Sequence, residues 1–316
     1  MKAIEYDRYG TPEVLTLREV EVPEAGRGQV RVRVRAAALN PKDCLVRKGR
    51  FRNVTGKKFP RRAGYDFAGE VDAVGSGVND MAIGDAVFGM LNGWAGGTHA
   101  EYVVASWHEL AHKPPAIDFA DAAGIPLAAQ TALQALRDLG RSGPGRHVLI
   151  NGCGGGVGTL AVQLATILGA RVTGVCSAAN AEQARQLGAA EVIDYTQTEI
   201  SGAGARFDTV FDVFGNLDFR QARALLRPGG IYISTVPSAG IVLAHLATRL
   251  LPPPLRRARL VVVKSRHRDL VWLAEQMDAG RLRPVTDRTW PLAQAAEAHA
   301  YQETRRARGK VVLTVD

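Results

Sequence analysis

A dense run of glycines, INGCGGGVGTLAVQ, occupies residues 150–163 and is the stretch whose residue types point most directly to chemistry. Five glycines within seven residues are costly in chain entropy, so the backbone must follow a tight path there. At a strand-to-helix turn, glycines let the backbone approach a pyrophosphate, and the free N–H groups of the following helix face the phosphates. The run therefore predicts a dinucleotide-binding turn, with Gly154, Gly155, Gly156 and Val157 as cofactor-binding residues.

The run departs from the G-x-G-x-x-G pattern of dinucleotide-binding turns. If Gly158 is the last glycine, Gly155 is the middle one and Cys153 holds the first position. A small residue still fits there, and we interpret Cys153 as a packing residue rather than a nucleophile. The strand, helix and second strand expected around the run fall where a dinucleotide fold requires them.

The end of the next expected strand, GVCSAAN at residues 174–180, bears on the choice between NADH and NADPH. Enzymes that bind NAD usually place an acidic residue about 20 positions after the glycines, where it binds the ribose 2′-hydroxyl. Cys176 and Ser177 stand at that place, so we expect no carboxylate to be present there to repel a 2′-phosphate. Ser177, Asn180 and Tyr195 are candidate donors to that phosphate, and we predict NADPH as the cofactor.

The elements that must position this turn follow from the residue pattern. From His147 onwards, strand-like and helix-like stretches alternate through HVLIN, TLAVQLATILG, RVTGVC, AEQARQLGA, EVIDY, FDTVFDVFG, FRQARALLRPGG and IYISTV. This alternation predicts βαβ units and a parallel sheet. In the first third, QVRVRVRAAAL alternates valine with arginine, and more short strands separated by turns predict a barrel-like β domain. An Ala- and Leu-rich helical stretch at residues 118–140 joins the two parts.

The bulk composition narrows the class of protein. The 316 residues exceed what one hydrophobic core usually supports, so we expect two domains. No run of about 20 apolar residues occurs, the first ten residues lack a signal-peptide core, and the three cysteines are widely spaced. We therefore expect a cytoplasmic protein with no membrane span and no disulfide framework. The net charge of +9 raises nucleic acid as a partner, but the scattered arginines favour an ordinary basic surface.

Taken in order, NGCGGGVGTLAVQLA, GYDFAGEVDAVGSGV, PLAAQTALQAL, GAAEVIDY and RGKVVLTV resemble the medium-chain dehydrogenase/reductase superfamily, and within it the zinc-independent branch of quinone oxidoreductase-like and enoyl reductase-like enzymes. The resemblance covers essentially the whole chain. It implies an α/β fold with a GroES-like β-rich catalytic domain at 1–122, completed by 264–316. It also implies a Rossmann NADPH-binding domain with a doubly wound parallel sheet at 123–263, and a cofactor in the cleft between the domains.

Zinc-dependent members of this superfamily carry a cysteine ligand early in the chain and a Gly-His-Glu motif later. The matching places hold Asn40, in LNPKDC, and Tyr65, in AGYDF, which cannot complete a zinc site of cysteine and histidine ligands. The four-cysteine structural zinc lobe is absent too, so we expect no bound metal. Without a Lewis acid, hydride transfer to an already electrophilic carbon is easier to catalyse. That favours quinones, enones or enoyl thioesters as substrates.

The resemblance assigns further residues to the site. Asn40 and Tyr65 are the predicted catalytic donors to the developing enolate oxygen, and Asp43 is predicted to support Asn40 or its loop. The remaining predicted cofactor-binding residues are Thr131, at the family position near the nicotinamide, Phe214 and Lys310.

Alternatives stay open for substrate and for function. Leu45 stands where some quinone oxidoreductases carry a tyrosine, so a reductase is better supported than a quinone substrate. The chain is alternatively a zinc-free alcohol dehydrogenase or a specialised biosynthetic reductase. A third possibility is an NADPH-binding protein without turnover, as crystallin-like and RNA-binding relatives are. We expect a monomer or a homodimer.

The stretch AGIVLAHLATRLLPPPLRRAR, residues 239–259, is apolar and then basic. It is typical of a helix that covers the cleft and is ended by Pro252–Pro254. Alternatively, it is a segment that contacts a membrane surface or an acyl chain.

Overall fold

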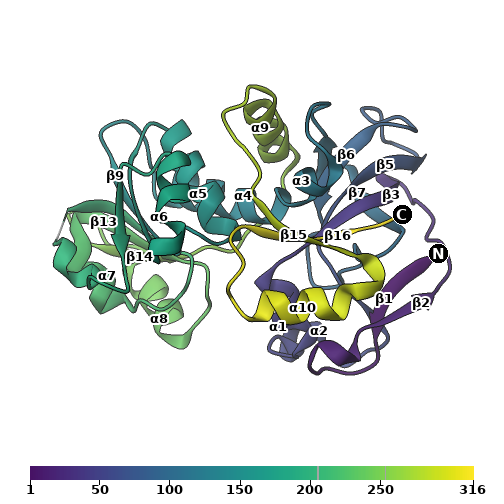
Figure 1. Cartoon of the computed structure of the whole chain (residues 1–316), viewed down its shortest axis with the longest axis horizontal. Helices are drawn as coiled ribbons and strands as arrows, with labels where there is room; N and C mark the ends of the chain where they lie inside the picture. The colour runs from purple at the N-terminus through teal and green to yellow at the C-terminus, as the bar shows by residue number, and fades with distance from the viewer. Residues whose placement is uncertain (205, 253) are drawn as a thin grey trace. The chain divides into compact units, whose positions relative to one another are not determined.

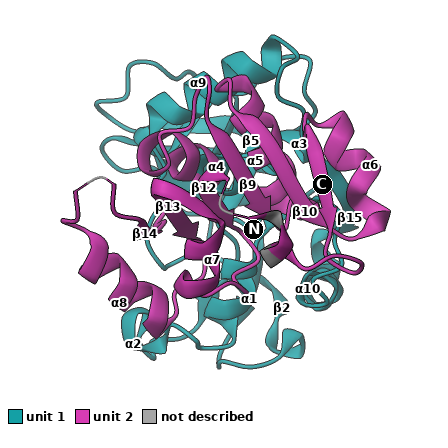
Figure 2. Cartoon of the chain, turned by 90° about the vertical axis from the view of Figure 1, so that its left-hand side faces the viewer, with its two compact units in different colours: residues 1–130, 264–316 teal, residues 131–263 magenta. Residues whose placement is uncertain are grey.

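The computed structural model describes residues 1–204, 206–252 and 254–316, and the chain divides into two compact units (Figure 2). The first unit comprises Met1–Gln130 and Lys264–Asp316, and the second comprises Thr131–Val263. The division at residue 130 falls inside the helix α4, Pro126–Leu133, whereas the sequence placed the boundary at 122. No helix among the described residues has the length and apolar character needed to cross a membrane.

The second unit contains one six-stranded sheet in the order β11-β10-β9-β12-β13-β14, with every neighbouring pair parallel (Figure 1). This strand order is that of a doubly wound dinucleotide-binding sheet, so the predicted α/β fold class is confirmed. The strands are β9 His147–Asn151, β10 Arg171–Cys176, β11 Glu191–Asp194, β12 Phe207–Asp212, β13 Leu226–Ser234 and β14 Arg257–Leu260.

Helices connect these strands because parallel neighbours need a crossover of about a dozen residues or more. They are α5 Gly156–Ile167, α6 Ala178–Gln186, α7 Phe219–Leu225 and α8 Ala239–Thr248, with a short 3-10 helix at Ile200–Ala203. Burial on both faces explains why β9 is apolar throughout its middle and fully buried.

Four features, in the connecting helical stretch and in the second unit, differ from the sequence prediction. The helical stretch expected over 118–140 is divided into α3, Phe119–Ala123, α4, and a π-helical segment, Gln134–Leu139. Strand β13 begins at Leu226, so the RPGG residues lie in the strand instead of ending a helix. Helix α8 ends at Thr248, before Pro252 and Pro254, and Pro253 lies outside the described residues. The basic residues that follow form the edge strand β14, whose arginines gave no strand signal.

The first unit contains a larger sheet in the order β15-β16-β3-β5-β6-β8, with β7 also paired to β3, and a small sheet β2-β1-β4. Its strands are β1 Lys2–Tyr6, β2 Thr16–Glu19, β3 Gln29–Leu39, β4 Arg61–Arg62, β5 Asp66–Val74, β6 Ala86–Met90, β7 Tyr102–Ser106, β8 Leu110–His112, β15 Thr286–Pro291 and β16 Lys310–Thr314. Its other helices are α1 Pro41–Arg47, α2 Arg52–Thr55, α9 His267–Asp278 and α10 Ala295–Glu303, with 3-10 turns at Pro12–Val14, Trp107–Glu109 and Leu292–Gln294.

Strand β3 organises this sheet because its residue pattern gives it two different faces. Val30, Val32 and Val34 are buried, while the arginines between them are partly or fully exposed. From Ala36 to Leu39 every residue is buried. The strand therefore enters the core at its carboxyl end, immediately before α1.

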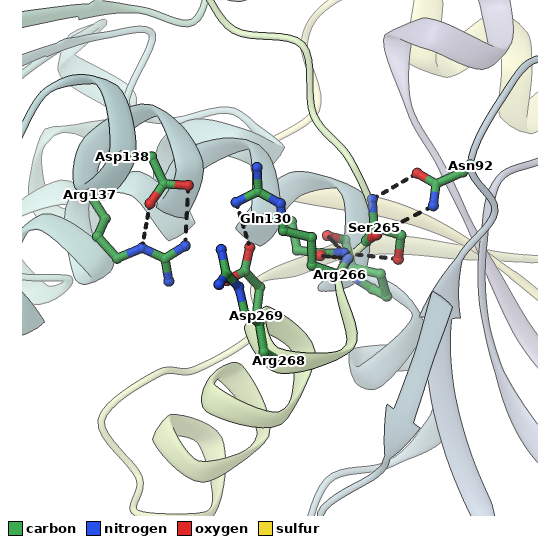
Figure 3. Close-up of polar contacts among 9 residues, drawn as sticks. Asn92, Gln130, Arg137, Asp138, Ser265, Arg266, Arg268 and Asp269 are labelled. Carbon is green, nitrogen blue, oxygen red and sulfur yellow. Dashed lines mark hydrogen bonds and ion pairs between the residues drawn. The ribbon is translucent and has the colours of Figure 1, made fainter. Parts of the chain in front are cut away.

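The chain returns to the first unit through hydrogen bonds that fix residues 265 and 266 (Figure 3). The side chain of Asn92 accepts from the N–H of Ser265 at 2.8 Å and donates to its carbonyl at 3.3 Å. The amide oxygen of Gln130 accepts from the N–H of Arg266 at 2.8 Å. The Arg266 guanidinium also lies 3.7 Å from the carboxylate of Asp269 on α9. These contacts attach α9 and the strands after it to the first unit.

Two fully buried histidines face each other in the core of the first unit. The rings of His99 and His299 lie edge to face with their centroids 5.5 Å apart, and both residues are 0% exposed. Both ring nitrogens of His99 and Nε2 of His299 have no hydrogen-bond partner. Burial lowers the pKa of His99 to about 3, and burial together with the neighbouring His99 lowers the pKa of His299 well below 6.5. Both rings are therefore neutral in the folded protein.

The buried pair predicts a loss of stability in acid. A histidine whose folded pKa lies below its unfolded value stabilises fully above about pH 6.5 and loses that contribution as the pH falls towards its folded pKa. Because His99→Leu removes one such group, the slope of unfolding free energy against pH between 6.5 and 4 should decrease by about 1.4 kcal/mol per pH unit. Urea titrations at several pH values measure this slope, and equal slopes for the two proteins would contradict the assignment.

Candidate functional site

A buried carboxylate, Asp66, gathers four separate segments of the first unit. Its Oδ2 accepts from Nδ2 of Asn40 at 2.9 Å and lies 3.5 Å from Nζ of Lys310. Its Oδ1 accepts from the backbone N–H of Leu127, near the start of α4, at 2.8 Å. Lys310 also donates to Oδ1 of Asn40 at 2.6 Å. The carboxamide of Asn40 is therefore hydrogen-bonded to the protein at both its oxygen and its nitrogen.

Burial governs the charges in this cluster. Asp66 is 0% exposed and Lys310 is 4% exposed, so each loses the hydration that an ion prefers. Burial raises the pKa of Asp66, while Lys310 and the hydrogen bonds from Asn40 and Leu127 oppose that rise. Burial lowers the pKa of Lys310, and the neighbouring Asp66 and Asp43 oppose the fall. The two charges depend on each other for their presence in the interior.

Asp43 is attached to the same cluster through the start of α1. Its Oδ2 accepts from the backbone N–H of Asn40 at 2.6 Å, while its Oδ1 is buried without a partner. Pro41 occupies the first helical turn, where a missing N–H costs nothing. Burial raises the pKa of Asp43 to about 7, and the nearby Asp66 adds to the rise. Asp43 can thus change protonation near neutral pH.

Lys42 lies beside these carboxylates and against an aromatic ring. Its Nζ is 3.6 Å from the centroid of the Tyr65 ring and 5.2 Å from that of Trp94, and it donates to the carbonyl of Gly93 at 2.9 Å. Burial lowers the pKa of Lys42, although Asp43 and Asp66 oppose the fall. The hydroxyl of Tyr65 donates to the carbonyl of Trp94 at 3.0 Å, and burial raises the pKa of Tyr65. An ammonium group with a lowered pKa is a competent proton donor.

In the second unit, the predicted cofactor-binding residues follow the carboxyl ends of adjacent parallel strands. The glycine run follows β9, Ser177 follows β10, Tyr195 follows β11 and Phe214 comes two residues after β12. Because neighbouring parallel strands end at the same edge of a sheet, these segments meet there. Tyr195 is 60% exposed and Phe214 is 47% exposed, so both side chains are available to a ligand.

The glycine run forms a tight turn into α5. Its positive φ, +88°, falls on Gly152, which precedes the positions assigned from the sequence pattern. A Cβ on Gly158 would lie 2.0 Å from the carbonyl oxygen of Gly152, so the helix packs directly on the turn. A Cβ on Gly155 would meet only that oxygen, at 3.8 Å. The first N–H groups of α5 have no preceding helical carbonyls to bond, which suits them to bind an anion.

Asn180 and Ser177 lie at the start of α6. A Cβ on Gly154 would lie 2.6 Å from Nδ2 of Asn180, and Oδ1 of Asn180 is buried without a partner. Ser177 is the N-cap of α6, but its side chain makes no capping bond and is free to turn elsewhere. Asp194 also lies here, since the N–H groups of Thr196 and Ala178 lower its pKa. Sequence reasoning named Tyr195 for this region but not Asp194, the residue immediately before it.

Comparisons with known proteins place the chain in a family. Family models described as "Alcohol dehydrogenase GroES-like domain" and "Zinc-binding dehydrogenase" match residues 26–115 and 187–313. Over 99% of its length the chain is 36% identical to "Quinone-oxidoreductase QR1, chloroplastic" of Triphysaria versicolor, covering 98% of that protein. The chain belongs to the quinone oxidoreductase-like branch of the medium-chain dehydrogenase/reductase superfamily.

Two more relatives extend this result. Over 99% of its length the chain is 37% identical to "NADPH-dependent alkenal/one oxidoreductase, chloroplastic" of Arabidopsis thaliana, covering 79% of that protein. The solved structure of the quinone oxidoreductase from Coxiella burnetii is 33% identical, with a TM-score of 0.91, over 100% of this chain and 99% of that one. The resemblance recognised from the sequence motifs is thereby confirmed.

This member of the superfamily lacks a grouping of metal ligands in the part of the chain that the structure describes. No three His, Cys, Asp or Glu side chains there are placed so that they could hold a metal ion. At the two places that match zinc ligands elsewhere in the superfamily, Asn40 bonds to Asp66 and Lys310, and the Tyr65 ring lies under Lys42.

Sequence reasoning missed two residues of the cluster and assigned a third, Lys310, to the cofactor instead of to Asn40. Asp66 and Lys42 were not singled out, although an acid within the apolar strand DFAGEV and a lysine beside Asp43 were visible signals. Lys310 was assigned to the cofactor, but its Nζ lies with Asn40 and Asp66 in the first unit. Thr131 is buried on α4. The roles of Asn40, Tyr65 and Asp43 towards a substrate stay predictions.

The cluster predicts a large loss of stability when its cation is removed. Lys310→Met leaves Asp66 buried without its counter-ion, which should lower the unfolding free energy by about 3 kcal/mol or more. In Lys310→Met/Asp66→Asn no such charge remains, so the loss should be smaller than the sum of the two single losses. Lys57→Met, at an exposed position, is the matched control. Urea denaturation of the wild type, the two single variants, the double variant and the control measures these losses, and a Lys310→Met protein as stable as the wild type would refute this account of the cluster.

Proposed function

We propose that this protein is an NADPH-dependent oxidoreductase that transfers hydride to a quinone or to an α,β-unsaturated carbonyl compound. The observation that carries the proposal is full-length similarity to proteins named quinone oxidoreductase and NADPH-dependent alkenal/one oxidoreductase. The confirmed superfamily fold and the glycine turn at the carboxyl edge of the β9–β12 sheet support it.

The residues of the second unit fit NADPH. The open space beside Gly155, where an added Cβ would meet only the Gly152 carbonyl oxygen at 3.8 Å, leaves room for a pyrophosphate at the start of α5. At the start of α6, Oδ1 of Asn180 has no hydrogen-bond partner and the Ser177 hydroxyl makes no capping bond. Both groups can form hydrogen bonds with a ligand. Asp194 accepts hydrogen bonds from backbone N–H groups and from the Thr196 hydroxyl. These donors partly offset the negative charge of its carboxylate. Exposed Tyr195 and Phe214 offer ring faces.

Bound NADPH would supply a hydride to the β-carbon of an enone, or to a quinone. The electron pair displaced from the carbon–carbon double bond then moves to the carbonyl oxygen as an enolate, and the α-carbon accepts a proton. We assign to Lys42 the stabilisation of the enolate oxygen or the delivery of that proton, because its ammonium is poised by burial and held against Tyr65. Asn40, through its bonds to Asp66 and Lys310, acts as the positioning residue for α1.

We further propose that the activity is independent of zinc, since an amide and a phenol stand at the superfamily's zinc-ligand places and a conjugated carbonyl needs no Lewis acid. A cytoplasmic location is proposed from the three free, buried cysteines, which suit a reducing compartment. NADPH consumption with an enone or a quinone distinguishes this function from a protein without turnover, and oxidation of alcohols alone would indicate an alcohol dehydrogenase.

Activity should be present in the purified protein and should depend on Lys42. NADPH absorbance should fall with an enone and with a quinone, and should continue to fall in the presence of a chelator. Lys42→Met should lower kcat by about 100-fold without changing the Kd for NADPH, because only the proton donor is lost. Lys48→Met, at the C-cap of the same helix and remote in role because its Nζ pairs with Glu303 at 2.7 Å, is the control. No NADPH consumption with either substrate, or oxidation of alcohols alone, would exclude the proposed reaction.

The cofactor turn is tested by Gly155→Val. Gly155 has an extended backbone, with φ −89° and ψ 178°, and open space beside it, so valine is tolerated by the fold but should fill the place of the pyrophosphate. NADPH binding, followed by fluorescence titration, should be abolished while the circular dichroism spectrum is retained. Gly143→Val, where an added Cβ meets only the carbonyl of Leu168 at 3.8 Å, is the control. Unchanged affinity in Gly155→Val would remove the dinucleotide assignment of this turn.

The preference for NADPH over NADH is tested by Ser177→Asp. Aspartate is also a good N-cap, so α6 should persist, but its charge repels a 2′-phosphate. The Kd for NADPH should rise by about tenfold or more while the Kd for NADH changes little. Ser177→Ala separates loss of a hydrogen bond from repulsion. Equal affinities of the wild type for the two cofactors would disprove the preference.

A further inference from the structure

The fold gathers four arginines at one edge of the six-stranded sheet in the second unit. Strands that run parallel all begin at the same edge, so the residues that begin neighbouring strands lie near one another there. Each arginine immediately precedes a strand or is one of its first two residues, at β9, β10, β12 and β13: Arg146, Arg171, Arg206 and Arg227. The glycine turn lies at the opposite, carboxyl edge of the same sheet. These arginines are scattered in the sequence, and only the fold makes them a group.

Two of these arginines share one carboxylate. Glu191, the first residue of β11, accepts from Nη2 of Arg171 and from Nη2 of Arg206, both at 2.8 Å. Because one carboxylate balances only one of the two guanidinium groups, these three side chains keep one positive charge. Nε of Arg206 is also buried without a hydrogen-bond partner, so a donor within the group is unsatisfied.

The other two arginines share a second carboxylate. Asp208 on β12 lies 3.1 Å from Nη1 of Arg146 and 3.4 Å from Nη1 of Arg227. The same carboxylate accepts from the backbone N–H of His147 at 2.8 Å. Among the described residues, no other carboxylate forms an ion pair with any of the four arginines. Four guanidinium groups and two carboxylates therefore leave a net charge of +2 at this edge.

The four arginines line an open cavity of about 440 Å³, together with Glu191 and His147. A volume of this size lies within the range of about 300–1,000 Å³ that small-molecule sites occupy. Burial lowers the pKa of His147, and three of the arginines lower it further against the opposing effect of Glu191. The carboxylates therefore do not cancel the positive potential of the cavity.

Guanidinium groups suit phosphate oxygens because their planar N–H donors match the anion and always carry a charge. A phosphate dianion would also balance the net charge of the cavity. We propose that this group of side chains binds the phosphate group of a small phosphorylated molecule, and we call it the arginine edge: Arg146, Arg171, Arg206, Arg227, Glu191 and Asp208.

The arginine edge is separate from the glycine turn. Strand β10 runs from Arg171 to Cys176, which is about 16 Å at about 3.3 Å per residue. A phosphate bound beside Arg171 is therefore not one of those that the start of α5 would hold. The proposal does not rest on the reductase activity and is measured without it.

Isothermal titration calorimetry with inorganic phosphate tests the proposal on the full chain, in the absence of NADPH. The wild type should bind phosphate. Arg171→Gln and Arg227→Gln should each raise the Kd by about fivefold or more, because each removes a positive charge from the cavity. The double variant Arg171→Gln/Arg227→Gln has no net charge at the arginine edge and should not bind. The two side chains are 62% and 47% exposed, so folding should be retained in all three variants, as circular dichroism can verify.

Glu191→Gln distinguishes a binding site from a set of structural ion pairs. The change breaks the ion pairs with Arg171 and Arg206 but raises the net charge of the arginine edge, so the Kd for phosphate should fall severalfold. Unchanged or weaker binding would contradict the proposal. Ribose 5-phosphate should bind at least as tightly as inorganic phosphate, and ribose should not bind, because the phosphate group carries the recognition.

Two controls separate the arginine edge from general charge and from the glycine turn. Arg223→Gln removes an exposed arginine from α7 in the same unit and should leave the Kd unchanged. Gly155→Val, which fills the glycine turn, should still bind phosphate at the arginine edge. A failed cofactor assignment would thus leave this result intact.

Four outcomes would overturn the proposal. The first is a wild type that binds no phosphate, and the second is an equal loss in Arg223→Gln and in the arginine-edge variants. The third is binding that is lost in Gly155→Val but kept in Arg171→Gln/Arg227→Gln, since the ion would then lie at the glycine turn. The fourth is affinity for inorganic phosphate or single-stranded RNA without affinity for ribose 5-phosphate, since the ligand would then be the free ion or a polyanion.

Discussion

The hydrogen bonds and charges around Asp66 join four segments of the first unit that are far apart in the sequence. One buried carboxylate binds side chains at residues 40 and 310 and a backbone N–H at residue 127, so the end of β3, the start of β5, α4 and β16 must meet at one point. Burying the Asp66 carboxylate without its partners would cost several kcal/mol, so each of these segments depends on the others for its place. Helix α1 begins directly beside it, so the position of Lys42 follows from it.

The two units carry different parts of the proposed chemistry. In the second unit, the glycines before α5 carry no side chains, so a pyrophosphate can approach the backbone closely. The N–H groups of the first turn of α5 are then available to its phosphates. In the first, buried polar groups matter, since they hold an ammonium group in partly desolvated surroundings beside Tyr65. Hydride chemistry needs both a bound dinucleotide and a proton source. The chain supplies groups suited to each without a cluster of metal ligands among its described residues.

Local signals made the second unit predictable, whereas distant contacts made the cluster hard to foresee. The glycine turn, β9, α5 and β10 follow one another in sequence, so their pattern was enough to predict the fold class that the structure has and to propose where a dinucleotide binds. Asp66 and Lys310 are 244 positions apart, and nothing in either neighbourhood indicates the other. Likewise, β11 brings Asp194 to α6, and an arginine-rich sequence becomes the edge strand β14. Tertiary packing decided these features, and local propensity did not.

The fate of a labelled hydride tests the central claim most directly. The protein would be incubated with an enone and with NADPH that carries deuterium in place of both hydrogens at carbon 4 of the nicotinamide, and the product analysed by NMR. The account predicts one deuterium at the β-carbon of the saturated ketone, with the proton at the α-carbon drawn from solvent. Saturated product without deuterium at the β-carbon, or deuterium at the carbonyl carbon of an allylic alcohol, would contradict it.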